Sequence, residues 1–106
     1  MTEQDERDDI GGWRVRIDDL DRRLLELLNE RSRCSLAIGA IKRRRGSRVY
    51  DPVREAEIVS NVLKANGGPM GDDAIRRLFE RILDESRRLE RTSMQSQASN
   101  DGAEDV

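Results

Sequence analysis

The sequence predicts an all-α protein with one long helix followed by two shorter ones. Apolar residues recur at spacings of three and four, the periodicity of a helix with one buried face. No segment shows the strict apolar-polar alternation of a half-buried strand. Residues typical of turns, chiefly glycine and proline, divide the periodic region into three parts. Together these observations favour helices packed against helices.

The first predicted helix runs from about Trp13 to about Arg45 and contains no proline. At 1.5 Å per residue it would be about 50 Å long, more than the width of a compact domain of this size. We therefore expect it to need a further packing partner, with Trp13 packing at its start. Its 3-4 stripe comprises Ile17, Leu20, Leu24, Leu27, Arg31, Cys34, Ile38 and Ile41.

The second predicted helix follows Gly46 and Ser47, which end the first. Asp51 is its expected N-cap, and Pro52 takes the first helical position, where a missing N–H costs nothing. The run Asn66-Gly67-Gly68-Pro69 ends it. Its apolar side comprises Val53, Ile58, Val59, Val62 and Leu63.

The third predicted helix opens at residues 71–73, where two aspartates suit the positive end of the helix dipole, and continues to about Arg91. Its apolar positions are Ile75, Leu78, Phe79, Ile82, Leu83 and Leu89. Residues 1–11 and 95–106 are polar, so ordering them would bury little, and we expect two disordered tails around one domain at 12–94. With 35% apolar and 3% aromatic residues, that domain is expected to oligomerise.

Composition excludes several classes of function. The 20 basic and 22 acidic residues create no net field that would attract nucleic acid or an anionic membrane. Without histidine and with one cysteine, the chain has no intrachain disulfide, no Cys/His metal site and no Ser/His pair. We expect Cys34 to be a small core residue rather than a nucleophile. No apolar run would span a bilayer and the start does not resemble a signal peptide, so we expect a cytoplasmic protein.

Polar residues interrupt the stripes that should be buried. Arg31 and Lys42 face one strip of the first helix, since eleven residues bring the second only about 20° round from the first. Ser86 and Glu90 continue the apolar row of the third helix, and Glu55 shares a side with the apolar residues of the second. Because buried unpaired charges are costly, this pattern predicts a pocket with two cations, two carboxylates and a hydroxyl. The alternative is a structural ion pair of Arg31 with Glu90 or Glu55.

The basic run Lys42–Arg45, with Arg48 nearby, is compatible with a nucleic-acid patch. However, it lies at a helix C-terminus, where cations are favourable in any case. Aromatic residues for base stacking are missing around it. We therefore do not expect nucleic acid as a partner.

Three segments resemble the all-helical (AroQ-type) chorismate mutases, covering about residues 13–90. WRVRIDDLDRRLLELLNERSRCSLAIGAIK is similar to the family's first helix, VYDPVREAEI to its loop and second helix, and IRRLFERILDESRRLE to its third helix. The family's functional positions in these segments fall on Arg14, Arg31, Lys42, Asp51, Arg54, Glu55, Ser86 and Glu90.

The resemblance implies an isomerase of aromatic amino-acid biosynthesis that converts chorismate to prephenate, without cofactor or metal. It implies an intertwined helical homodimer whose long first helices pair. Arg14 of the partner subunit and Arg31 would clamp the substrate carboxylates, with help from Ser86. The residues themselves agree, because Arg14 and Arg31 are about 25 Å apart along one helix, too far to hold one small ligand together.

The remaining positions would serve the reacting bond and the ring. By the resemblance, Lys42 and Glu90 address the ether oxygen, Glu55 and the backbone near Asp51 address the ring hydroxyl, and Arg54 supports the wall of the site. Many family members have Gln in place of Glu90. A glutamate must be protonated to donate, so we expect burial to raise its pKa and activity to fall at higher pH.

Two other functions remain open at this stage. One is a relative acting on isochorismate or 4-amino-4-deoxychorismate, as a pyruvate lyase or mutase. The other is a non-catalytic helical dimer that binds protein or nucleic acid, although this leaves the inward Lys42, Ser86 and Glu90 unexplained. Whether another enzyme docks on the chain to activate it is also open.

Overall fold

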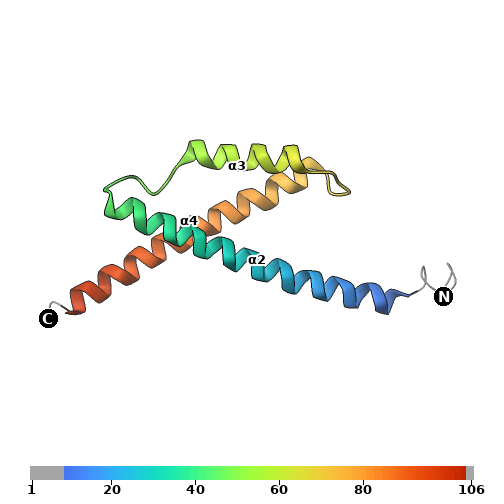
Figure 1. Ribbon diagram of the computed structural model, residues 1–106, viewed down its shortest axis with the longest axis horizontal. Coiled ribbons are helices and arrows are strands. Elements are labelled where there is room, and N and C mark those ends of the chain that lie inside the picture. The colour runs from blue at the N-terminus through green and yellow to red at the C-terminus, as the bar shows by residue number, and fades with distance from the viewer. Residues whose placement is uncertain (1–8, 105–106) are drawn as a thin grey trace. The chain divides into compact units, whose positions relative to one another are not determined.

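The computed structural model describes the backbone of residues 9–104 and the side chains of residues 9–94. Regular structure in this part consists of three helices, α2 (Ile10–Arg44), α3 (Pro52–Ala65) and α4 (Asp72–Glu104) (Figure 1). The all-α prediction is confirmed. The chain forms two compact units, Met1–Arg33 and Cys34–Val106, and the boundary falls inside α2. Of the predicted N-terminal tail, residues 1–8 lie outside the described residues, and α2 already begins at Ile10.

The end of α2 is set by Gly46. The N–H of Gly46 donates to the carbonyl of Arg43 at 3.1 Å, and the N–H of Ser47 donates to the carbonyl of Lys42 at 2.8 Å. These two bonds make a Schellman cap, which needs a left-handed residue, and Gly46 has a φ of 70°. The cap holds Lys42 in the last turn, where its charge also suits the helix dipole.

The start of α3 follows the prediction. The side chain of Asp51 accepts a hydrogen bond from the N–H of Arg54 at 3.0 Å, and Pro52 is the first helical residue. After Ala65, the Asn66 amide donates to the carbonyl of Met70 and to Oδ1 of Asp72, both at 2.9 Å. These bonds order the connection into α4.

The predicted end of the third helix near Arg91 is wrong, because α4 continues to Glu104. Its 33 residues make it almost as long as the 35-residue α2. The predicted tail at 95–106 is therefore helical in its backbone as far as Glu104. Gly102 is the first glycine after Arg91 and no proline follows, so the sequence contains no local stop signal before that point.

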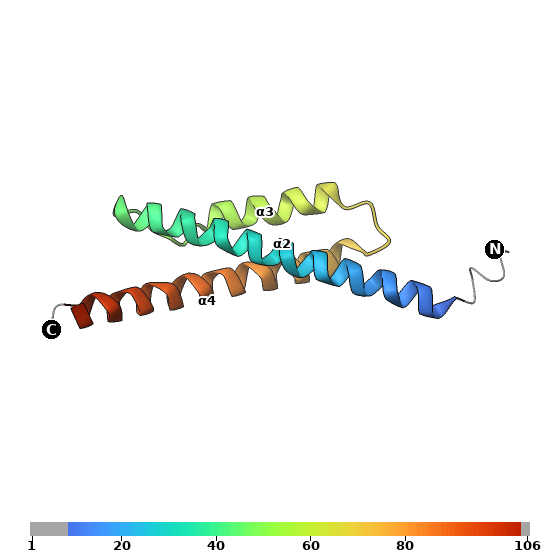
Figure 2. The same ribbon diagram turned by 60° about the horizontal axis from the view of Figure 1, so that its bottom comes forward.

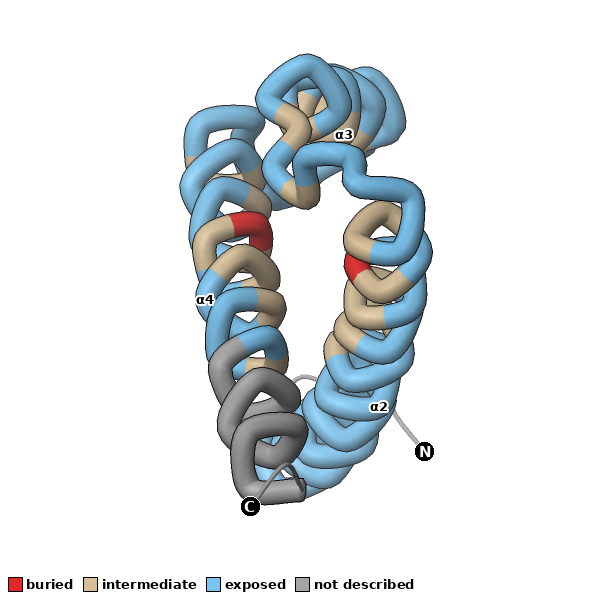
Figure 3. The backbone as a smooth tube through the Cα atoms, turned by 90° about the vertical axis from the view of Figure 1, so that its left-hand side faces the viewer, coloured by how far each residue is buried: buried red, intermediate tan, exposed pale blue. Residues whose placement is uncertain are grey.

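In the second unit, α3 packs against α4, and the 66–71 loop joins them (Figures 1 and 2). The buried positions among the described residues are Leu83 in α4, 6% exposed, and Gly39 in α2 (Figure 3). Cys34 is exposed, so its predicted burial is wrong for a single chain: one chain supplies too little apolar surface to cover it. Within residues 9–104, none of the helices is long and apolar enough to cross a membrane.

The first unit has no buried residue within residues 9–33. The stripe residues Ile17, Leu20, Leu24 and Leu27 are 46% to 61% exposed. Apolar side chains at this spacing on one helix normally pack against a partner. This observation agrees with the expectation that the helix needs one.

Candidate functional site

The last turn of α2 meets the loop before α3 through Lys42 and Asp51. Nζ of Lys42 lies 3.8 Å from Oδ2 of Asp51, while Oδ1 of the same carboxylate caps α3. Both side chains are partly shielded from solvent, at 28% and 46% exposure. Asp51 therefore holds the start of α3 and neutralises part of the charge of Lys42.

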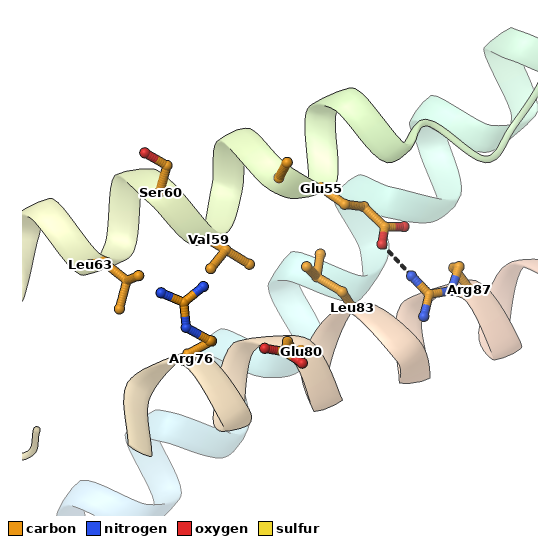
Figure 4. Close-up of a pocket in the computed structure, with 9 residues that line it drawn as sticks. Glu55, Val59, Ser60, Leu63, Arg76, Glu80, Leu83 and Arg87 are labelled. Carbon is orange, nitrogen blue, oxygen red and sulfur yellow. Dashed lines mark hydrogen bonds and ion pairs between the residues drawn. The ribbon is translucent and has the colours of Figure 1, made fainter. Parts of the chain in front are cut away.

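Across the groove between α3 and α4, Glu55 forms an ion pair with Arg87 (Figure 4). Nη2 of Arg87 also lies 3.3 Å from Oδ1 of Asp84, one turn earlier on α4. The hydrogen bond with Glu55 raises the pKa of Arg87 above its ordinary value, so this guanidinium stays charged. The partner of Glu55 is thus a residue that the sequence reasoning did not single out.

Glu90 faces the last turns of α2. A Cβ atom placed on Gly39 would lie 3.8 Å from Cγ of Glu90, so the two helices approach closely at this point. Burial raises the pKa of Glu90, opposed by the positive charges of Lys42 and Arg43. An upward shift of the pKa of Glu90 agrees with the expectation from the sequence.

Arg43 is a second residue that the sequence reasoning missed. Its Nη1 atom is buried and has no hydrogen-bond partner within the described part of the chain. A Cβ on Gly39 would lie 3.5 Å from this nitrogen, so the side chains of Arg43 and Glu90 both lie next to Gly39. The missed signal was spacing, since Arg43 follows the small Gly39 by four residues and Arg87 follows the core residue Leu83 by four.

Two more predicted residues lie in this unit. Ser86 is half-buried on α4, one turn before Glu90 and on the same face. The side chain of Arg54 is 56% exposed and pairs with Glu57 on its own helix at 2.9 Å. The second unit therefore brings Lys42, Asp51, Glu55 and Glu90 into one electrostatic cluster, whereas Arg54 points its charge at the surface.

Arg14 and Arg31 belong to the first unit. Arg14 is exposed and Arg31 is half-buried. Both lie on the continuous helix α2, whose geometry separates them by about 25 Å. Within one chain, these two guanidinium groups therefore do not converge on one small ligand.

A groove with a volume of about 630 Å³ runs between α3 and α4. Leu83, Val59 and Leu63 supply its apolar lining, and Glu55 and Arg87 pair across it (Figure 4). The described residues contain no group of three or more acidic or cysteine side chains placed to hold a metal ion. Chemically, the second unit offers fixed cations, a carboxylate and an acid that burial favours in its protonated form. Such groups stabilise developing charge without forming a covalent bond.

Comparison with known proteins identifies the family of the chain. The family described as chorismate mutase type II matches residues 13–91. The bifunctional chorismate mutase/prephenate dehydratase of Stutzerimonas stutzeri is 34% identical over 90 residues, covering 80% of this chain and 25% of that protein. The corresponding protein of Neisseria gonorrhoeae is 37% identical over 75 residues, covering 71% and 20%. This chain thus spans about a quarter of the length of such relatives.

Solved structures extend the likeness to the fold. The structure of chorismate mutase (form II) from Thermus thermophilus superposes with a TM-score of 0.75 at 38% identity, covering 77% of this chain and 93% of that one. Form I from the same organism gives 0.72 at 38% identity, covering 73% and 96%. Fold and sequence therefore agree over the region that carries the cluster.

Proposed function

This chain belongs to the chorismate mutase type II family, and we propose that it catalyses the [3,3] rearrangement of chorismate to prephenate. The observation that carries the proposal is the cluster around Glu90. Lys42 is placed at the capped end of α2, and burial gives Glu90 a raised pKa beside it. A cation and a protonated acid together suit an ether oxygen that gathers negative charge as its bond breaks.

The rearrangement is intramolecular and needs neither a nucleophile nor a proton transfer. The chain therefore has to bind the compact, reactive conformer of the substrate and stabilise the charge that develops. We assign Lys42 and protonated Glu90 to the ether oxygen, and Glu55 with the backbone near Asp51 to the ring hydroxyl. Arg31, assisted by Ser86, is assigned to a substrate carboxylate, because a guanidinium fork matches carboxylate geometry.

We propose further that the enzyme is a homodimer in which Arg14 of the partner subunit completes each site. Two observations support this. Arg14 is too far from Arg31 along α2 for both to serve one ligand from the same chain. The apolar stripe of the first unit is exposed in a single chain, and a second copy of the same stripe would cover it.

The test is direct. Purified protein is mixed with chorismate, and the enol-ether absorbance is followed while prephenate is identified as the product. We expect turnover that vanishes in Lys42→Ala and persists in Arg44→Ala, an exposed neighbour in the same turn. A folded dimer that leaves chorismate unchanged at micromolar concentration would contradict the proposed activity.

A further inference from the structure

Arg87 lies where three segments of the second unit meet. It pairs with Glu55 from α3 (Figure 4). It also lies 3.3 Å from Asp84 of its own helix. Its guanidinium carbon is 5.6 Å from the centre of the Tyr50 ring, in the loop before α3. A guanidinium held by two carboxylates and a ring face is fixed in orientation, because its donors form a rigid fork.

We propose that Arg87 is a positioning residue that aims the carboxylate of Glu55 at the ring hydroxyl of the substrate, an inference that rests on the proposed function. Arg87 engages Oε1 of Glu55. A carboxylate has two accepting oxygens, so Oε2 can accept a hydrogen bond from the ring hydroxyl while Oε1 is held by Arg87.

Charge explains why Glu55 needs this support. Its side chain is only 21% exposed, and its negative charge raises the pKa of Glu90 while Arg87 lowers it. Lys42 and Arg43 of α2 face Glu90 as well. Without Arg87, a partly buried Glu55 would lose its counter-charge beside Glu90, and turning out toward water would become favourable. That change removes the acceptor that the ring hydroxyl requires.

The competing explanation is that Arg87 only braces α3 against α4. The two roles differ in one respect. A brace matters equally for every substrate, whereas a residue acting through Glu55 matters only when the substrate carries the ring hydroxyl. A chorismate analogue with hydrogen in place of that hydroxyl therefore separates them.

The experiment compares Arg87→Met with Arg88→Met on both substrates. Arg88 is a matched control because it follows Arg87 and lies 3.7 Å from the same Asp84, yet is 58% exposed. Losing a charged hydrogen-bonding partner should lower kcat/KM for chorismate about tenfold in Arg87→Met. The loss should be within about twofold for the analogue, and Arg88→Met should change neither.

Two further variants keep the proposal falsifiable if Arg87→Met folds poorly. Arg87→Lys retains a positive charge beside Glu55 and should recover part of the loss. In a Glu55→Gln background, the effect of Arg87→Met should shrink to within about twofold, because the residue it acts through is gone. Equal losses on both substrates in a folded dimer, or additive losses in the double variant, would overturn the proposal. A wild-type protein that converts neither substrate would instead refute the proposed function itself, and this inference with it.

Discussion

The two units of the chain differ in how far their side chains are paired or buried within a single chain. In the second unit, charged groups from three helices are paired or compensated within one chain: Lys42 by Asp51, and Glu55 by Arg87. In the first unit, the stripe from Ile17 to Leu27 is exposed, and no residue from 9 to 33 is buried. The comparison indicates that the charges of the second unit are compensated within one chain, whereas the apolar stripe of the first unit lacks a cover that one chain supplies.

A large effect should come from Arg31, a half-buried cation of the first unit. Arg31→Ala removes a guanidinium assigned to a substrate carboxylate, and we expect kcat/KM to fall by about 10²–10³. The exposed Arg33 supplies a matched control, so Arg33→Ala should stay near wild type. Both variants should remain helical dimers by circular dichroism and light scattering. Comparable activity of the two variants would show that the charge of Arg31 does not contribute to catalysis.

The apolar stripe of the first unit can be disrupted by a substitution that leaves the charged residues of the second unit unchanged. Leu24→Asp puts a charge into the expected dimer seam twice per dimer, and the dimer dissociation constant should rise about a hundredfold or more. Arg22→Asp, placed about 160° round the helix from Leu24, is the control. Sedimentation equilibrium measures both. An unchanged dimer in Leu24→Asp would mean that the stripe is not the interface.

The role of Glu90 in the second unit can be tested by the pH dependence of activity. Because burial raises its pKa, the acid form that donates to the ether oxygen is lost as pH rises, and wild-type activity should fall through that pKa. Glu90→Gln donates at every pH, so its profile should be flat and its rate should exceed wild type about tenfold well above the transition. Glu85→Gln, exposed on the same helix, should keep the wild-type profile. Identical pH profiles in wild type and Glu90→Gln would remove Glu90 from the mechanism.

The same group links pH to stability. A carboxyl whose pKa is raised on folding contributes stability below its unfolded pKa, and that contribution is lost as pH rises through the folded pKa. Glu90→Gln should therefore be more stable relative to wild type at neutral pH than at acidic pH. Urea unfolding at fixed protein concentration measures this difference. A relative stability independent of pH would show that folding does not raise the pKa of Glu90.

The smallest effect concerns Gly39, the buried glycine of α2. An added Cβ would make ordinary contacts at 3.5 to 3.9 Å with Arg43 and Glu90, so alanine fits. Gly39→Ala should raise the free energy of unfolding by up to about 1 kcal/mol through helix propensity. Ala37→Gly, in the same turn, should lower it by a similar amount. A clear destabilisation by Gly39→Ala would mean that α2 and α4 lie closer together than described.

The predictable parts of the fold were those with local signals. Gly46 and Asp51-Pro52 mark their helix boundaries by backbone chemistry alone, and the structure has caps at both. The end of α4 was not predictable, because no glycine or proline follows Arg91 before Gly102 and a polar helix was mistaken for a tail. Polarity reports how much a segment can bury, not whether its backbone is helical.

In the candidate site, too, sequence patterns predicted some residues and missed others. Lys42 and Glu90 were predicted from periodicity, because Lys42 shares a strip of the first helix with Arg31 and Glu90 continues the apolar row of the third helix. Arg87 was missed, since it stands next to Arg88 in a run that reads as a solvated face. Its role depends on Glu55, 32 residues away, and only the packing of α3 on α4 brings the two together.

The central claim is that each site combines the cluster of one chain with Arg14 of the partner subunit. Arg14→Ala and Lys42→Ala homodimers should both be inactive. If the two variants are unfolded and refolded together, a mixed dimer regains one site with both residues intact, provided that Arg14 acts across the interface. Equal amounts should recover about a quarter of wild-type activity, because half the dimers are mixed and each has one working site. Activity that stays at the level of the separate variants would contradict the shared site.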